Sequence, residues 1–570
     1  MKKYVVRNDI PRDIDQALLA YPELIRKLLY YRDVTTPEAA HTFLNPNFET
    51  GVHDPYLHKD MDKAVERILR AIENNEKVLI YSDYDADGIP AAVIMHDFFK
   101  AIGFTNFEVY IPHRHTEGFG LHLEAVDKFK EQGVNLMITL DCGIVDVDEV
   151  KSANSFGIDV IITDHHEAGP ELPPAYAIVN AKQKDCEYPF DYLCGSGVAF
   201  KLVQAVLKKK RFDLKEGAEK WFLDMAGLAT LSDMVPLHGE NRVLAYYGLK
   251  VLRKSRRPGL IKLLSIMKMN QAYITEDDVG FMITPRINAA SRMGIPKDAF
   301  MLLSETDEPT AHGFAKHLDE INKERKTLVA TLVKEVKKVM LEREEHFRNQ
   351  RVIVLGNPAW RPAILGLAAN TIAEEHNKPV FLWGREEGVH IKGSCRSDGV
   401  SDLTQIMAGA RHAFIDCGGH KMSGGFSVDH EKIHHLEEAL VSSFAAMNTA
   451  KLEPEPEMLD AVLTLDEVTW QLYNHIEKLA PFGMGNPKPT FLFPKVTISG
   501  VKMFGKHQEH LELSFKNSNN KIIKSIGFFM KPEDFANTPK EGKNIDLVAT
   551  LEKSMFGGKT ELRMRIVDLI

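Results

Sequence analysis

The stretch YSDYDADGIP at residues 81–90 constrains the fold more than any other part of this chain. It follows the apolar run at residues 78–80, which is short and aliphatic and is therefore typical of a strand buried on both faces. Three carboxylates, Asp83, Asp85 and Asp87, then fall within five residues. Because like charges held this close repel one another, we expect cations to lie among them in the folded protein.

Gly88 allows the backbone to turn and Pro90 suits the first turn of a helix, so the stretch predicts strand, acidic turn and helix. The spacing DxDxDG also begins an EF-hand calcium loop. That loop needs a bidentate Glu at its twelfth position, where this chain has Ile94, and it follows a helix rather than a strand. An EF-hand is therefore excluded. Solvated turn acids stay an alternative, because Asp and Gly are ordinary turn residues.

Length and composition limit the class of protein. A chain of 570 residues predicts roughly three or four domains, and 44% hydrophobic with 26% charged residues is the composition of a globular protein. The five cysteines form no CxxC pair, which favours a reducing compartment without structural zinc. Because no apolar signal segment or long apolar run is present, we expect a cytoplasmic protein with no membrane partner. The net charge of −9 does not exclude a local basic channel.

Apolar runs alternate with helical segments after residue 77, which predicts an α/β fold with a doubly wound, mostly parallel sheet. The predicted strands are 78–82, 107–111, 135–140, 159–163 and 176–179. Polar residues follow three of them, namely Asp85 and Asp87, then Asp141, then Asp164, His165 and His166. Since the carboxyl ends of parallel strands meet at one edge of a sheet, we expect these side chains to converge where such folds bind ligands.

Asp233, in ATLSDMVPL, is a further candidate ligand, and a simple acid at a helix end is the alternative interpretation. Carboxylates and imidazole without a thiolate suit manganese or magnesium and do not select zinc. The sequence therefore predicts a hard metal site.

Four separated motifs, YSDYDADG, LDCG, ITDHHE and SDMVPL, resemble those of the DHH phosphoesterases in order and spacing. A longer set resembles the RecJ family of single-strand exonucleases over nearly the whole chain: IPHRHTEGFGL, PRINAASRMG, GSCRS, GGHKMSGGF and PFGMGNPKPTF. The resemblance implies two divalent cations, Mn²⁺ or Mg²⁺, and the ligand set Asp85, Asp87, Asp141, His165 and Asp233.

The resemblance also implies that Asp141 bridges the two cations and that His166 contacts the phosphate, so His166 joins the five ligands as a predicted catalytic residue. Two cations can acidify a shared water and neutralise a phosphodiester. Tyr81 stands where related pyrophosphatases place a histidine ligand. We do not expect Tyr81 to bind metal.

Arginine makes bidentate contacts to phosphate that lysine does not match. Four arginines lie inside the motifs, and a surface salt bridge is the alternative for each.

GGHKMSGGF lacks the ending of a Walker loop, so we expect phosphate contact there rather than a nucleoside triphosphate site, with an ordinary turn as the alternative. GSGVAF at residues 195–200 is too weak to indicate a dinucleotide site. The predicted substrate-binding residues are Arg114, Arg286, Asn288, Arg292, Ser394, Arg396, Ser397, Gly419 and His420.

The predicted domains follow from these segments. A charged stretch with helical apolar spacing predicts a long connecting helix whose lysines form a solvated face, and 452–458 is typical of an acidic linker. We expect a helical segment at 1–60, the DHH catalytic domain at 61–306, the connecting helix at 307–350, a DHH-associated substrate-binding α/β domain at 351–450 and an OB-type β-barrel at 451–570.

The C-terminal barrel is predicted from five short strands near 491–503, 509–516, 521–530, 544–553 and 560–569. Lysines and phenylalanines alternate there, as in barrels that bind single strands, and barrel core is the alternative for each phenylalanine. These residues are Lys502, Lys506, Lys524, Lys553, Lys559, Phe504, Phe515, Phe528 and Phe556.

The sequence thus predicts an enzyme, a metal-dependent exonuclease that hydrolyses single-stranded DNA to 5′-mononucleotides. Its 5′-to-3′ polarity, its work in recombination and repair, and partners such as a single-strand binding protein and a helicase are implied by the resemblance alone. Two alternatives stay open: a DHH phosphatase or oligonucleotidase for small substrates, and a non-catalytic Cdc45-like DNA-binding scaffold. The added barrel favours a polymer substrate, and the full set of acids favours catalysis.

Overall fold

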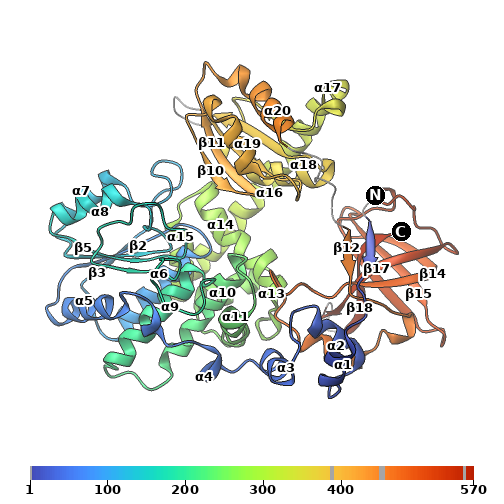
Figure 1. Cartoon of the computed structure of the whole chain (residues 1–570), viewed down its shortest axis with the longest axis horizontal. Coiled ribbons are helices and arrows are strands. Elements are labelled where there is room, and N and C mark those ends of the chain that lie inside the picture. Colours follow the sequence, from blue (N-terminus) through green and yellow to red (C-terminus); the bar gives the residue numbers. More distant parts are fainter. Residues whose placement is uncertain (1–2, 386–390, 448–455, 556–559) are drawn as a thin grey trace.

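The computed structural model describes residues 3–385, 391–447, 456–555 and 560–570. Figure 1 shows two α/β domains joined by a long helix, with a β-barrel to one side of them. Within the described residues no helix is both long and apolar enough to cross a membrane. The predicted fold class, a doubly wound α/β domain followed by a second α/β domain and an OB-type barrel, is confirmed.

The first α/β domain contains a five-stranded sheet in the described chain, with the order β3-β2-β4-β5-β6 and every pairing parallel. Each predicted strand is present within one residue of its expected bounds: β2 (Val78–Ser82), β3 (Phe107–Tyr110), β4 (Leu136–Leu140), β5 (Asp159–Thr163) and β6 (Ala177–Val179). Helices cover both faces, which explains why β2 and β4 are buried along their whole length.

The helices of this domain fall into two groups. The first accompanies the sheet and comprises α4 (Phe48–Gly51), α5 (Met61–Glu73), α6 (Gly88–Ala101), α7 (Leu123–Glu131), α8 (Val147–Ser155) and α9 (Gly195–Lys209). The second lies beside it and comprises α10 (Leu223–Ser232), α11 (Gly239–Leu252), α12 (Pro258–Ile266), α13 (Glu276–Asp278), α14 (Thr284–Met293) and α15 (Lys297–Ser304). Helices α5, α6 and α9 and most of the second group share one hydrophobic core with one face of the sheet, whereas α7 and α8 pack on its other face in a separate core.

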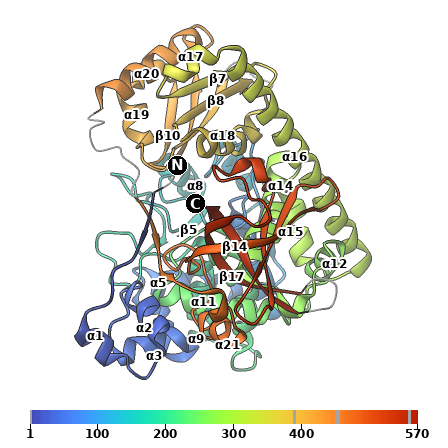
Figure 2. The same cartoon turned by 90° about the vertical axis from the view of Figure 1, so that its right-hand side faces the viewer.

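The connecting helix α16 (Glu308–Glu342) runs along one edge of the molecule, as Figure 2 shows. Its first part packs into the core of the first domain through Leu318, and its second part packs into that of the second domain through Val336. The single helix predicted to residue 350 is wrong at its end, because α16 ends at Glu342 and a separate helix, α17 (Glu344–Asn349), follows.

The second α/β domain has the strand order β10-β11-β9-β8-β7 in the described chain, and β7 with β8 is its parallel pair. Its elements are β7 (Ile353–Gly356), α18 (Pro362–His376), β8 (Val380–Arg385), β9 (Ile391–Arg396), α19 (Leu403–Gly409), β10 (Asp416–His420), β11 (Ser423–Val428) and α20 (Leu436–Ala446). GGHKMSGGF is therefore not a phosphate-binding loop before a helix. It forms the β10–β11 hairpin, in which Gly419 pairs with Gly424.

The barrel closes because β14 pairs with both β15 and β17. Its five predicted strands are confirmed as β14 (Phe491–Phe504), β15 (His510–Lys516), β16 (Ile522–Phe528), β17 (Asn544–Ser554) and β18 (Glu561–Leu569), preceded by β13 (Ala461–Val462) and α21 (Trp470–Glu477). Phe515 is fully buried in the barrel core. Residues 452–455 of the predicted linker, Phe556 and Lys559 lie outside the described residues.

The N-terminal segment belongs to the barrel rather than standing apart. Apolar residues of α1 (Arg12–Ala17), α2 (Glu23–Tyr30) and α3 (Pro37–Leu44) join the barrel core, and β1 (Tyr4–Val6) pairs with β12 (Glu457–Leu459). The Arg242 guanidinium, on α11, donates to the carbonyls of Phe43 and Leu479. This buried side chain ties the N-terminal segment, the barrel and the first domain together.

Candidate active site

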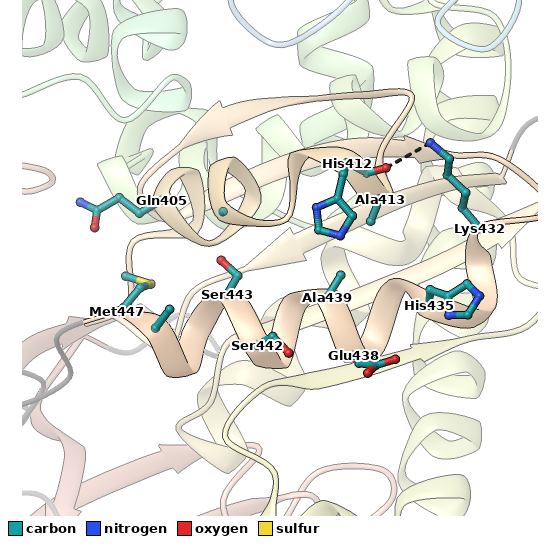
Figure 3. Close-up of a pocket in the computed structure, with 12 residues that line it drawn as sticks. Gln405, His412, Ala413, Lys432, His435, Glu438, Ala439, Ser442, Ser443 and Met447 are labelled. Carbon is teal, nitrogen blue, oxygen red and sulfur yellow. Dashed lines mark hydrogen bonds between the residues drawn. The ribbon is translucent and has the colours of Figure 1, made fainter.

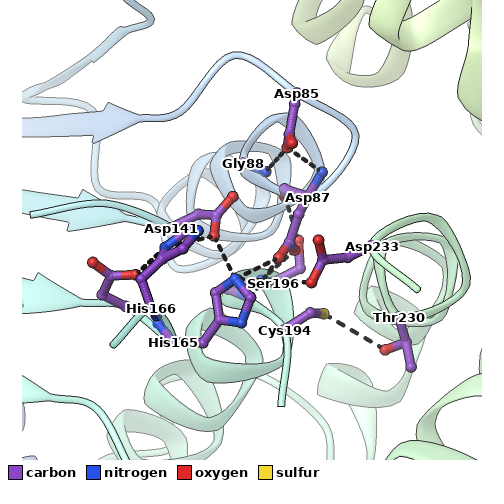
Figure 4. A network of polar contacts seen from close by, with 12 residues as sticks. Asp85, Asp87, Gly88, Asp141, His165, His166, Cys194, Ser196, Thr230 and Asp233 are labelled. Atoms are coloured by element: carbon purple, nitrogen blue, oxygen red, sulfur yellow. Dashed lines mark hydrogen bonds and ion pairs between the residues drawn. The ribbon is translucent and has the colours of Figure 1, made fainter. Parts of the chain in front are cut away.

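Side chains from four parts of the first domain meet at the carboxyl edge of its sheet (Figure 4). Asp85 and Asp87 lie in the turn between β2 and α6, Asp141 follows β4, His165 follows β5, and Asp233 caps the end of α10. The Nε2 atom of His165 lies 3.1 Å from a carboxylate oxygen of Asp141, 3.7 Å from one of Asp87 and 3.8 Å from one of Asp233. The structure therefore brings the acids and the histidine to one place.

Three overlapping groups at this edge can each hold a cation, with ligand atoms within 4.8 Å of one another. They are Asp87 with His165 and Asp233, Asp83 with Asp85 and Asp141, and Asp141 with His165 and His166. Asp141 and His165 each belong to two of them, and the bridging role of Asp141 stays a prediction. The backbone of Asp141 has φ of +62°, a strained conformation for a residue other than glycine.

Burial and mutual repulsion dominate the electrostatics of the carboxylates. Burial, and then the charges of Asp87, Asp85, Asp83 and Asp233, raise the pKa of Asp141 well above its usual value. Burial, and then Asp87 and Asp85, raise the pKa of Asp233 to about 9. One oxygen of Asp83 and one of Asp141 are buried and accept no hydrogen bond from the described residues.

These observations test whether the residues fit divalent metal. Buried carboxylate oxygens without donors are strongly unfavourable unless a cation compensates them. Burial lowers the pKa of His165, which favours the neutral imidazole that a metal ion needs. Oxygen and imidazole ligands suit Mn²⁺ and Mg²⁺. The site fits divalent cations held by Asp83, Asp85 and Asp87 together with Asp141, His165 and Asp233.

The N-terminus of α9 fixes Asp87. The backbone amides of Gly195 and Ser196 donate to its two carboxylate oxygens over 2.6 and 2.7 Å, and the Ser196 hydroxyl donates to its carbonyl. A side chain at position 195 would approach Asp141 within 2.5 Å, so only glycine fits there. GSGVAF therefore has a positioning role in this site.

Asp164 holds the ring of His166 in place. Its Nδ1 lies 2.8 Å from a carboxylate oxygen of Asp164, which also accepts the amides of His165 and His166. Burial alone would lower the pKa of His166, but the Asp164 hydrogen bond and the surrounding carboxylates raise it to about 9. Because Nδ1 contacts Asp164, Nε2 of the imidazolium is the nitrogen left for another acceptor. The contact of His166 with phosphate stays a prediction.

Three of the predicted arginines lie where the two α/β domains meet. Arg292, on α14, donates to the carbonyl of Ala363 at the start of α18. Burial, and then the nearby charges of Arg114, Arg325 and Arg396, lower the pKa of Arg292 to about 10. Among the described residues, Arg114, Arg292 and Arg396 form no ion pair with a carboxylate.

The contacts of Arg396 position its guanidinium to bind an anion. It donates to the Ser394 hydroxyl and to the carbonyl of Cys395, while burial and then the charge of Arg114 lower its pKa. Repelling guanidinium groups that lack carboxylate partners form a ready site for phosphate, which they bind through charge-assisted hydrogen bonds.

A hollow of 860 Å³ lies elsewhere, between α19 and α20 of the second domain (Figure 3). None of the predicted site residues lines it. This hollow is therefore separate from the predicted metal site at the edge of the first sheet.

The sequence matches three known domain families: the DHH family, N-terminal domain, over residues 77–230, the DHHA1 domain over 349–446, and the RecJ OB domain over 459–568. The single-stranded-DNA-specific exonuclease RecJ of Bacillus subtilis strain 168 is 34% identical over 550 residues, which are 96% of this chain and 67% of that protein. The chain belongs to the RecJ family. RecJ of Escherichia coli K12 is 30% identical, with 76% of this chain and 77% of that protein covered.

Solved RecJ structures agree with this assignment. RecJ of Thermus thermophilus in complex with Mn²⁺ superposes with a TM-score of 0.81 at 25% identity, covering 100% of this chain and 79% of that one. An exonuclease RecJ bound to manganese gives a TM-score of 0.59 at 29% identity, covering 70% of this chain and 96% of that one. The metal in these RecJ structures is one that the ligand set described here suits.

The structure corrects the predicted role of Arg286. This side chain is buried in an ion pair with Asp319 on α16, at 2.8 Å, and donates to the carbonyl of Met282. It stabilises the junction of α14 with α16 and is not available to phosphate. The Ser397 hydroxyl is likewise used within a turn, where it donates to the carbonyl of Ser401 and accepts the amide of Gly399.

The other predicted substrate-binding residues lie in different surroundings and have different contacts. Asn288 accepts the amide of Ala86 over 2.9 Å, so it positions the acidic turn. Ser394 contacts Arg396. Gly419 and His420 lie on the exposed edge strand β10, and their contact with substrate stays a prediction.

Sequence reasoning left three contributors of this RecJ site outside the predicted set. Asp83 is one of the three turn acids among which cations are expected, but it is absent from the ligand set that the resemblance implies; it is 4% exposed and groups with Asp85 and Asp141. Asp164 was only the acid before two histidines, and Ser196 lay in a motif interpreted as too weak. The signal for Asp83 was its position directly after the buried strand, two residues from the next acid.

Replacing Asn288 with Ala should raise the Mn²⁺ concentration needed for half-maximal activity by about tenfold, because residues that orient metal ligands typically contribute about 10–100-fold to affinity. The Ala86 amide would lose its acceptor and the turn holding Asp85 and Asp87 would loosen. Metal titration of the nuclease rate measures the change. Asn370→Ala, on the exposed face of α18, is the matched control, and equal metal requirements in both variants would contradict the positioning role.

Proposed function

We propose that this protein is a metal-dependent exonuclease that hydrolyses single-stranded DNA. One observation carries the proposal: a set of buried carboxylates that need cations lies beside a set of arginines that need an anion. The charge of Asp85 raises the pKa of Arg292, and the charge of Arg114 lowers the pKa of Asp83. The two sets are therefore close enough for their opposite charges to interact. A phosphodiester between two bound cations and the arginines satisfies both sets.

The side chains divide the work of hydrolysis. Bound divalent cations supply charge to the phosphate and lower the pKa of water. The acids and His165 hold those cations, with Asp141 shared between groups. His166 donates from Nε2 to a phosphate oxygen while Asp164 keeps its ring in place. Arg114, Arg292 and Arg396 orient the strand end across the domain junction.

The finer features of the activity are part of the same proposal. The RecJ relatives are named as specific for single-stranded DNA, and a closed OB-type barrel is suited to binding a long strand rather than a dinucleotide. We propose 5′-to-3′ digestion to 5′-mononucleotides, a role in recombination and repair, and work beside a single-strand binding protein and a helicase. The five free cysteines agree with a reducing cytoplasmic location.

A time course on single strands labelled at either end, with Mn²⁺, Mg²⁺ or EDTA, tests this function. We expect a 5′ label to appear at once in mononucleotides, a 3′ label to remain in gradually shorter strands, and EDTA to stop both. Blunt duplexes and circular single strands are the controls and should persist. Preferential hydrolysis of dinucleotides would favour a small-substrate phosphatase, and metal-independent binding without hydrolysis would favour a scaffold.

A further inference from the structure

Large apolar side chains project into solvent at the edge of the metal site. Met234 directly follows Asp233 and is 66% exposed, Phe281 is 72% exposed and Met484 is 52% exposed. Exposed apolar residues are common when scattered singly. Here three of them come from separate segments, and one of them, Met234, directly follows a predicted metal ligand.

Hydrogen bonds join the segments that carry these three residues. The hydroxyl of Ser232, next to Asp233, lies 2.5 Å from that of Thr284, which is one helical turn from Phe281. The amide of Leu237, three residues after Met234, donates to the carbonyl of Met484 over 2.7 Å. We refer to Met234, Phe281 and Met484 as the apolar ridge.

The backbone of the apolar ridge is unusual. Met234 has φ of +59°, a conformation that costs a bulky residue free energy and is found mainly at functional sites. Phe281 occupies the middle of a π-helical turn, Val279–Ile283, inserted between α13 and α14. Such turns are rare and often mark functional positions. The side chains of Met234 and Phe281 face solvent, whereas Val279 and Ile283, at the two ends of the π-helical turn, are fully buried in the core.

The apolar ridge continues towards the barrel. Tyr273 is 50% exposed and lies on the segment before α13, and the ammonium group of Lys553, on β17, lies 5.7 Å from its ring centre. Figure 1 places α13 on the side of the first domain that faces the barrel. Aromatic and cationic groups thus connect the barrel with the metal site, an arrangement typical of surfaces that bind single strands.

We propose that the apolar ridge is a stacking platform for unpaired bases of the substrate strand as it passes from the barrel to the metal centre. This inference rests on the proposed function and identifies residues that select single strands. Phe281 offers a ring face, and the two flexible thioether side chains adapt to any base. Bases paired within a duplex are covered by their neighbours and cannot reach the platform, so unpaired strands bind more tightly.

Strand binding in EDTA tests the platform without relying on catalysis. We compare Phe281→Ala with the wild type by fluorescence anisotropy, using a labelled oligothymidylate of about 20 nucleotides and an abasic strand of equal length. Loss of one stacked base contributes about 1–3 kcal/mol, so we expect Kd for the oligothymidylate to rise about tenfold and Kd for the abasic strand to stay the same. Leu341→Ala, equally exposed at 72% on α16, should change neither.

Two results would overturn the platform. Unchanged binding of oligothymidylate by Phe281→Ala together with Met234→Ala would remove it, and equal weakening for both strands would show a contact with the backbone or a structural defect. Hydrolysis by the wild type separates the two proposals. If the wild type degrades no strand but the base-dependent loss of binding is observed, the platform stands and the exonuclease proposal fails.

Discussion

Replacing Asp141 with Asn should lower the rate of strand hydrolysis at saturating Mn²⁺ on the order of 1,000-fold, or about 4 kcal/mol. Asp141 lies in one cation group with Asp83 and Asp85, and its carboxylate is 3.1 Å from Nε2 of His165, a member of the group with Asp87 and Asp233, so its loss disturbs both groups. Rates on a labelled single strand measure the effect. A variant that keeps more than a tenth of the wild-type rate would contradict the assignment of Asp141 as the shared ligand.

The same substitution should raise the melting temperature in EDTA. Without cations, burial and four neighbouring carboxylates make the charge of Asp141 unfavourable, and an amide of nearly the same shape removes that charge. Asp164→Asn is the matched control with the opposite expected sign. Its carboxylate is stabilised by His166 and by the Ile144 amide, so its neutralisation should lower the melting temperature. Two shifts of the same sign would contradict the charge argument.

The pH dependence of the metal-free protein supplies a third readout of this prediction. The pKa of Asp233 is about 9 in the fold against a usual value of 3.8, so between these values the folded state binds more protons than the unfolded state. Stability in EDTA should therefore fall as pH rises from about 4 to about 9. Saturating Mn²⁺ should remove most of this dependence, because the cation replaces the protons.

Strand positions and the convergence of the acids were predictable from the sequence because both follow from local patterns. A buried parallel strand is a short apolar run, and its carboxyl end is marked by the first polar residue. Asp83, Asp141 and Asp164 each directly follow such a strand, and Asp85 and His165 come within the next two residues. The five strands of the barrel were found in the same way, from alternation and turns.

The roles of the arginines were not predictable, because they depend on partners far away in sequence. Arg286 and Arg292 lie six residues apart in one motif. Arg286 turns towards Asp319 on α16, whereas Arg292 turns towards the second domain and meets no acid among the described residues. Only the packing of α14 against α16 and α18 separates the two. The packing of the N-terminal helices against the barrel was not predictable for the same reason.

Replacing Arg396 with Gln should lower kcat/KM about 100-fold for single strands that carry a 5′-phosphate, since a hydrogen bond between charged groups contributes about 1.5–3 kcal/mol. Strands that end in a hydroxyl should be affected much less, so the preference for phosphorylated ends should disappear. Melting temperature should change little, because the Arg396 guanidinium has no carboxylate partner in the described chain and is repelled by Arg114. Competition assays with both kinds of end on one labelled strand length measure the preference.

Two further variants make the Arg396 result specific. Arg396→Lys keeps the charge but loses the planar fork, so it should recover only part of the preference. Arg286→Gln breaks the buried pair with Asp319 and should lower the melting temperature while reducing hydrolysis of both kinds of end equally. If Arg396→Gln behaves like Arg286→Gln, the arginines at the domain junction hold the two domains together rather than the end of the strand.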